Sequence, residues 1–197
     1  MKIARTLVLV ALTMAVLTVP AASQATVVGI DRYVASVKKA ETNRSRIIVA
    51  DTADENADKP KWEKFASEKA LEKHREKSET YSIAYNWKYR GKLATSHFTD
   101  FSSSGDWTQH TFHYFRPDGT LAKVEAELRT FEGDWIIIRN YYFDPKGKRL
   151  KRTAKYLDLT TKRPKKPTHD MLSDDWSGLN VTFYKTTSKL PFIKLID

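Results

Sequence analysis

The sequence contains no cysteine. Disulfide bonds, thiolate metal sites and thiol catalysis are therefore excluded, and stability has to come from a core of apolar side chains. No His-Glu-x-x-His pair, phosphate-binding glycine loop, Gly-x-Ser-x-Gly elbow or Ser-x-x-Lys motif occurs in a context that would support its chemistry. We therefore expect no cofactor and no metal site.

Long apolar runs are also missing, except for one that begins near the N-terminus. Leu7 to Val19 carries no charged residue and follows Lys2 and Arg5. This run of about 13 residues is shorter than the roughly 20 that a membrane-spanning helix needs. Pro20 ends the run, and small residues follow. The pattern predicts a cleavable signal peptide over residues 1–25 and an exported protein, periplasmic or extracellular, with no transmembrane segment in the mature chain. Without cysteine it is not a lipoprotein.

Residues 26–197 suit a single domain of the α+β class. We expect two N-terminal helices packed on a curved antiparallel β-meander of about six strands. The helical part would span residues 27–79 and the antiparallel sheet residues 80–159. A basic linker would follow over 160–170, and edge strands would complete the sheet over 171–197.

Both helices are predicted from the spacing of apolar residues. The first helix would end near Asn43 and bury Ile30, Tyr33, Val34 and Val37. The second would begin after Asp58 and Pro60 and run toward Lys77. One face of it would carry Trp62, Phe65 and Ala66.

The strands are predicted from alternating polarity and from turn residues. Tyr81 to Tyr89 alternates aromatic or apolar residues with polar ones, and Pro117 to Gly119 is a strong turn signal. Between such turns we expect strands at Leu93–Phe101, Trp107–Phe115, Thr120–Arg129, Trp135–Phe143 and Arg149–Leu159, with edge strands at Leu179–Thr186 and Leu190–Ile196. In the strand at 120–129, Val124 would face the core and Lys123 would face water.

Histidines are the candidates for acid-base chemistry. Strand alternation places His110 and His113 on opposite faces, whereas His97 on the preceding strand could pair with either. One of these three, together with Asp100 or Asp106, would make an acid-base site. The simpler interpretation, which we favour, is that the histidines are structural, so no catalytic residue is assigned.

Aromatic residues share a face of the predicted sheet. This face could bind an amphipathic ligand. The ligand-binding candidates are Tyr85, Trp87, Tyr89, Phe112 and Tyr114. Packing into the core is the competing explanation.

Positive charge is concentrated in one segment. Between positions 146 and 166, Asp158 is the one acidic residue, and the basic residues are Lys146, Lys148, Arg149, Lys151, Arg152, Lys155, Lys162, Arg163, Lys165 and Lys166. They could bind an anionic envelope component, such as a lipid headgroup, lipopolysaccharide or an acidic polymer. Export makes nucleic acid the less suitable partner. A solvated sheet edge, whose lysines deter aggregation, explains the same pattern.

The predicted order of elements allows three functions. Signal peptide, helix and meander resemble the layout of periplasmic lipid carriers with an open half-barrel, which implies a non-enzymatic binding protein. Helices followed by a sheet are also similar to the cone-shaped fold of many small enzymes, which implies a hydrolase or isomerase that uses histidine and aspartate. A structural envelope protein is the third alternative. The sequence leaves the ligand and the oligomeric state open.

Overall fold

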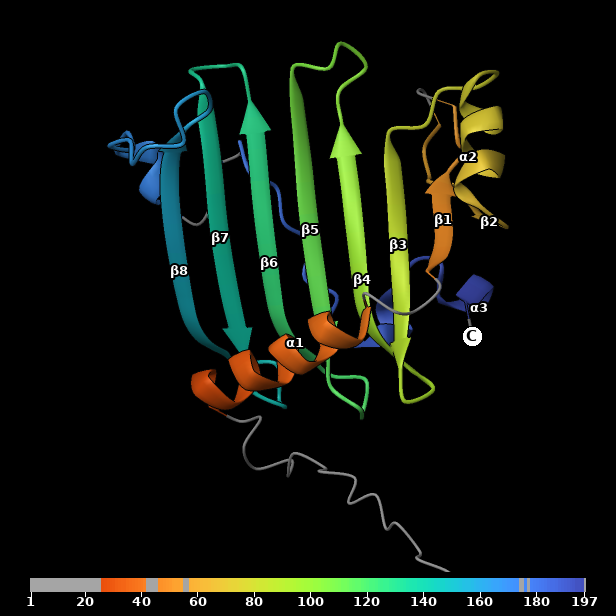
Figure 1. Cartoon of the computed structure of the whole chain (residues 1–197), viewed down its shortest axis with the longest axis horizontal. Helices are drawn as coiled ribbons and strands as arrows, with labels where there is room; N and C mark the ends of the chain where they lie inside the picture. The colour runs from red at the N-terminus through yellow and green to blue at the C-terminus, as the bar shows by residue number, and fades with distance from the viewer. Residues whose placement is uncertain (1–25, 42–45, 55–56, 174–175, 177, 197) are drawn as a thin grey trace, which may run out of the picture.

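The computed structural model describes residues 26–41, 46–54, 57–173, 176 and 178–196. The predicted signal peptide and the predicted end of the first helix at Asn43 lie outside these residues. The described chain forms one antiparallel sheet of eight strands in the order β2-β1-β3-β4-β5-β6-β7-β8 (Figure 1). The strands are β1 (Ile47–Asp51), β2 (Trp62–Phe65), β3 (Ser82–Tyr89), β4 (Lys92–Phe101), β5 (Trp107–Phe115), β6 (Leu121–Thr130), β7 (Trp135–Phe143) and β8 (Arg149–Asp158).

The predicted fold class, two N-terminal helices on a six-stranded meander, is wrong. Strands β3 to β8 lie where the alternation placed them, but β1 and β2 extend the sheet to eight strands. The error arose at Trp62 and Phe65, whose spacing of three suggested one face of a helix. In a strand, the same spacing puts two side chains on opposite faces. Trp62 accordingly packs against Phe192, and Phe65 packs against His74 on the other side of the sheet.

Only the C-terminal part of the predicted second helix is helical. Helix α2 (Glu68–Arg75) begins after Ser67, whose hydroxyl accepts a hydrogen bond from the amide of Ala70 at 3.2 Å. Such a cap satisfies one of the amides that a helix start leaves without a partner. Leu71 is the buried residue of this helix. Two charged side chains of α2 contact the sheet: Glu68 accepts a hydrogen bond of 3.5 Å from the hydroxyl of Tyr85, and the guanidinium of Arg75 lies 4.9 Å from the ring centroid of Phe101.

Helix α1 (Val27–Glu41) crosses one face of the sheet at one end of its strands, as Figure 1 shows. We call this the helix face. Apolar residues of α1 pack there on Ala94, Tyr114, Ala122 and Tyr142. The hydroxyl of Tyr33 donates a hydrogen bond of 2.6 Å to the carbonyl of Phe115. The helix therefore covers only part of the face, and the far ends of the strands extend beyond it.

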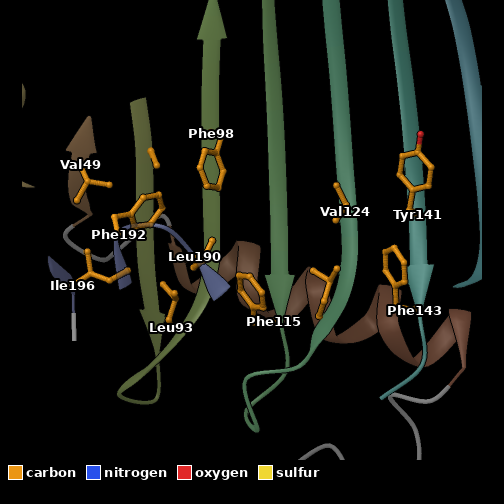
Figure 2. Packing of buried hydrophobic residues seen from close by; sticks show 12 residues of the cluster. Val49, Leu93, Phe98, Phe115, Val124, Tyr141, Phe143, Leu190, Phe192 and Ile196 are labelled. Carbon is orange, nitrogen blue, oxygen red and sulfur yellow. The ribbon is translucent and has the colours of Figure 1, made fainter. Parts of the chain in front are cut away.

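The C-terminal residues cover the opposite face, which we call the C-terminal face. They form two short 3-10 helices, η2 (Asp170–Leu172) and η3 (Thr187–Lys189), and helix α3 (Ile193–Ile196). The edge strands predicted at 179–186 and 190–196 are therefore wrong. Leu190, Phe192 and Ile196 instead pack on the main core cluster (Figure 2). Their apolar side chains bury more area on a sheet face than an edge strand would allow.

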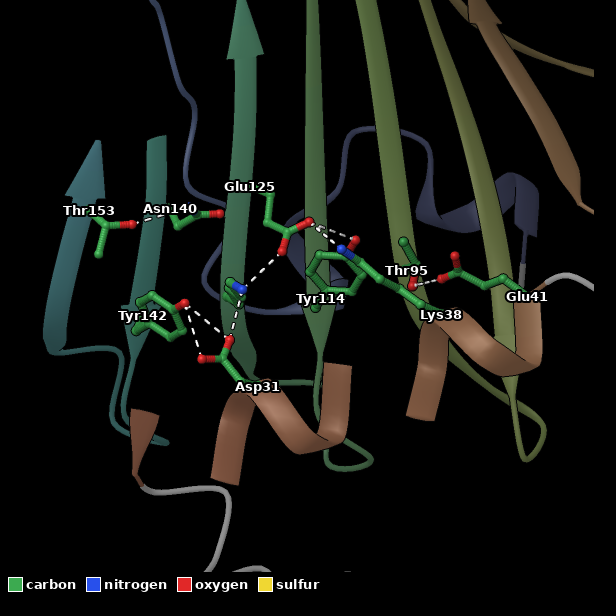
Figure 3. A network of polar contacts seen from close by, with 10 residues as sticks. Asp31, Lys38, Glu41, Thr95, Tyr114, Glu125, Asn140, Tyr142 and Thr153 are labelled. Atoms are coloured by element: carbon green, nitrogen blue, oxygen red, sulfur yellow. Dashed lines mark hydrogen bonds and ion pairs between the residues drawn. The ribbon is translucent and has the colours of Figure 1, made fainter. Parts of the chain in front are cut away.

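A polar network fixes α1 to the helix face, and it overturns the prediction that Lys123 faces water. Lys123 is 7 % exposed and its Nζ lies 2.8 Å from Asp31 of α1 and 2.9 Å from Glu125. The Nζ of Lys38 approaches Glu125 from the helix at 2.7 Å (Figure 3). Alternation puts Lys123 on the face opposite Val124, as predicted, but α1 covers that face and buries the ammonium group.

Candidate functional site

The uncovered part of the helix face carries three of the five predicted aromatic ligand-binding residues. The strand register places Tyr85, His97 and Phe112 side by side across β3, β4 and β5. Tyr114 is 1 % exposed and, like Tyr89, packs in the cluster beneath α1. The five predicted aromatic residues therefore do not form one ligand surface. Tyr85, Trp87 and Phe112 are half-buried and remain accessible candidates.

His97 and His110 meet on this same uncovered surface. The distance between Nε2 of His97 and Nδ1 of His110 is 3.1 Å. The ring of His97 also stacks on Phe112, with centroids 3.8 Å apart. Burial, together with His110, lowers the pKa of His97 to about 3. Burial also lowers the pKa of His110 below its usual range. Both imidazoles are therefore neutral at physiological pH.

His113 lies on the opposite, C-terminal face, as alternation predicted. Its side chain is buried, and its Nε2 lies 2.8 Å from the carbonyl oxygen of Thr182. Burial lowers the pKa of His113 to about 4. Since a neutral ring with its proton on Nε2 donates a hydrogen bond to that carbonyl, His113 anchors the C-terminal segment to β5.

A cavity of about 340 Å³ separates the C-terminal segment from β4 and β5. Its walls combine aromatic rings with hydrogen-bonding groups. They are formed by Phe98, Asp100, Trp107, Gln109, Thr111, His113, Asn180, Thr182 and Tyr184. Gln109 donates from its amide nitrogen to the carbonyl of Asn180 at 2.6 Å. This hydrogen bond joins the sheet to the C-terminal segment at the wall of the cavity.

Asp100 supplies the carboxyl group of this cavity. It accepts a hydrogen bond of 2.6 Å from the hydroxyl of Ser82. Burial nevertheless raises the pKa of Asp100 above its usual value, since it outweighs the effect of Ser82. A desolvated carboxyl at a cavity wall is well suited to bind a hydrogen-bond donor or a cation.

The described residues do not bring the candidate acid-base partners together. Asp100 shares a cavity with His113, but its hydrogen bond is to Ser82, while His113 is bonded to Thr182. Asp106 lies in the loop after β4 and accepts a hydrogen bond from Ser104. Among the described residues, no hydrogen bond joins a candidate histidine to a candidate aspartate. The geometry therefore gives the acid-base hypothesis no support.

The basic residues lie in the turn before strand β8, along β8 at the end of the sheet, and in the segment that follows it. Eight are exposed, namely Lys146, Lys148, Arg149, Lys151, Lys155, Lys162, Arg163 and Lys166. Lys165 and Arg152 are half-buried. The Nζ of Lys165 lies 3.9 Å from Oδ2 of Asp158, and the guanidinium of Arg152 donates a hydrogen bond to the carbonyl of Leu172. We call this set the basic edge.

Sequence reasoning missed several polar residues that shape these sites. Gln109 was treated as one position of an alternating strand, although it joins β5 to the C-terminal segment. Arg139 falls inside the strand predicted at Trp135–Phe143 but was given no role, although it is fully buried and donates to the carbonyl of Met171 at 2.8 Å. One signal was available for Arg139, because a charged residue inside a strand that is apolar on both faces has to be buried with a partner.

The fold and its sites define an antiparallel β-sheet protein with a helix on one face, a C-terminal segment on the other and a basic edge. Comparison of the chain with family models, curated proteins and solved structures finds no match. In the part of the chain that the structure describes, no helix is long and apolar enough to cross a membrane. The same residues contain no cluster of three or more His, Asp or Glu side chains suited to a metal ion.

Proposed function

We propose that the protein is exported and acts as a non-enzymatic binding protein that attaches to anionic lipid of the cell envelope through its basic edge. The observation that carries the proposal is the position of the ten basic residues, eight of which are exposed on the terminal strand β8 and on the segments directly before and after it.

The basic edge has charge available for a partner. Lys146, Lys148, Lys151 and Lys155 form no ion pair with any described residue. Lys151 and Lys155 lie on the same side of β8, because they are four residues apart, which corresponds to about 13 Å along a strand. An extended row of cations can contact several phosphate groups at once.

Exposed apolar residues beside these cations favour a lipid surface over a soluble acidic polymer. Leu150 on β8 is 41 % exposed, and Leu172, whose carbonyl accepts from Arg152, is 54 % exposed. Leucine side chains can enter the boundary between headgroups and acyl chains, whereas a polyanion in water offers them nothing. Peripheral binding of this kind needs no spanning helix.

Vesicle co-sedimentation tests this function. The protein should bind phosphatidylglycerol-containing vesicles, bind phosphatidylcholine vesicles weakly, and dissociate as salt is added. The triple variant Lys148→Gln, Lys151→Gln, Lys155→Gln should lose about 100-fold in affinity, at about 1 kcal/mol for each lysine.

The matched control is the triple variant Lys69→Gln, Lys73→Gln, Lys77→Gln, which removes the same charge from exposed positions in and just beyond α2. It should retain most of the binding. Equal losses in both variants would show that only net charge matters, and a failure to bind anionic vesicles at low salt would refute the function outright.

A small-molecule binding function is a second candidate, and the cavity favours it. Asp100 and the amide oxygen of Gln109 can accept hydrogen bonds, while Trp107 and Tyr184 offer flat apolar walls. Such a cavity suits a small aromatic ligand that carries an amino or other donor group. Native mass spectrometry of the protein purified from its own envelope fraction should reveal a bound ligand that Asp100→Asn loses. An empty wild-type protein that also fails to bind an aromatic amidine such as benzamidine contradicts this candidate.

A further inference from the structure

We propose that His97 and His110 form the protein part of a binding site for one divalent transition-metal ion, with Cu²⁺ preferred over Zn²⁺. This inference is independent of the proposed function and departs from the expectation of no metal site. It starts from the arrangement of the two imidazole rings on adjacent strands.

The spacing of the two nitrogen atoms fits bidentate coordination. Metal–imidazole bonds of about 2.0–2.1 Å that meet at angles of about 90–110° place the two nitrogens about 2.9–3.4 Å apart. Nε2 of His97 and Nδ1 of His110 are 3.1 Å apart. A direct hydrogen bond has a similar length. On metal binding, the ring that donates this hydrogen bond would take its other tautomer, with its proton on the outer nitrogen, so that both facing nitrogens present a lone pair.

The rings are oriented before any metal arrives. His97 pairs with Phe112 in the strand register and is stacked on it with an interplanar angle of 6°. Thr99 pairs with His110, and its Oγ1 lies 3.4 Å from each of the two facing nitrogens. The threonine hydroxyl is thus placed to hydrogen-bond a water molecule that completes the coordination shell.

A metal ion binds through the lone pair of an imidazole nitrogen, and each of the two facing nitrogens can present one. Arg46 and Arg129 raise the positive potential near the pair and so oppose a bound cation, while Glu127 favours it. With two nitrogen ligands and water, Cu²⁺ is the preferred ion because it leads the usual order of divalent affinities.

The test is a titration of the purified protein, produced without a polyhistidine tag, with CuCl₂. Isothermal titration calorimetry should show one equivalent bound at this site, and electron paramagnetic resonance should show nitrogen coordination. His97→Gln and His110→Gln should each weaken binding at least about tenfold, because each removes one of two protein ligands.

The control is His169→Gln, which changes an exposed histidine of the C-terminal segment and should leave this affinity unchanged. Zn²⁺ should raise the melting temperature of the wild type and the control but not of the double variant. A failure of the wild type to bind Cu²⁺, or copper binding that persists unchanged in a folded His97→Gln, His110→Gln double variant, would overturn the site.

Discussion

Lys123 of β6 and Asp31 of α1 form an ion pair, with 2.8 Å between Nζ and Oδ1, although 92 positions separate them in the chain. The same ammonium group lies 2.9 Å from Glu125, and Tyr142 donates to the same aspartate. These contacts raise the pKa of Lys123 above its usual value, even though burial acts in the opposite direction. The pair is therefore a point at which the helix is held to the sheet.

Removal of this ammonium group should destabilise the fold. We expect Lys123→Met to lower the free energy of unfolding by about 1.5–3 kcal/mol, the usual value for hydrogen bonds to charged groups. Lys38→Met is the matched control, since Lys38 also pairs with Glu125 but is 48 % exposed. Its cost should stay below about 1 kcal/mol. Urea unfolding measures both, and equal costs would contradict a special role for Lys123.

Acidification should destabilise the protein through His113. Burial holds the pKa of His113 at about 4 in the folded protein, against an ordinary value of 6.5. The unfolded chain therefore binds the proton first, so the stability contributed by the neutral ring is complete above pH 6.5 and is lost as the pH falls toward 4.

The His113→Gln variant isolates this effect, because glutamine keeps a donor for the carbonyl of Thr182 but does not titrate. Between pH 7.5 and pH 4.5, the wild type should lose about 2–3 kcal/mol more unfolding free energy than the variant. Urea unfolding at the two pH values gives the comparison. If the wild type and the variant lost the same unfolding free energy between the two pH values, His113 would not be held neutral in the folded protein.

Asp100→Asn should stabilise the protein at neutral pH. Because burial raises the pKa of Asp100, its charged form costs stability as the pH rises through that pKa. Asparagine still accepts the hydrogen bond from Ser82 without the charge. We expect a gain on the order of 1 kcal/mol at pH 7 that disappears at pH 3. Asp106→Asn, in an exposed loop, should change stability by less than about 0.5 kcal/mol. Chemical denaturation checks both, and a loss in Asp100→Asn would refute the prediction.

The turn at Gly119 should tolerate alanine less well than the turn at Gly91. Both glycines have positive φ angles, +83° and +78°. A Cβ atom at Gly119 would lie 2.9 Å from Oγ1 of Thr187, whereas a Cβ atom at Gly91 would have no neighbouring atom within 4 Å. Gly91→Ala should therefore cost about 1 kcal/mol and Gly119→Ala about 1 kcal/mol more. Thermal unfolding measures the difference, and identical costs would mean that Thr187 moves aside freely.

Local signals were sufficient to place strands β3 to β8 and helix α1. Alternation from Tyr81 to Tyr89 and the turn at Pro117 to Gly119 are properties of neighbouring residues, and short-range sterics enforce them. The same reasoning failed at Trp62 and Phe65, because a spacing of three suits a helix face and also two opposite faces of a strand. The pairing of these residues with β1, which the local spacing does not reveal, decides between the helix and the strand.

The sequence by itself determined that the fold has no disulfide bonds, that His110 and His113 face opposite sides of the sheet, and that ten basic residues are close together. Tertiary structure decided which part of the helix face α1 covers, that Lys123 is buried there, and that the C-terminal segment packs on the opposite face of the sheet. It also brought Nε2 of His97 to within 3.1 Å of Nδ1 of His110 and placed Asp100 at the wall of a cavity. The physical reason is that alternation and charge are local properties, whereas burial depends on which distant segment lies on a given surface.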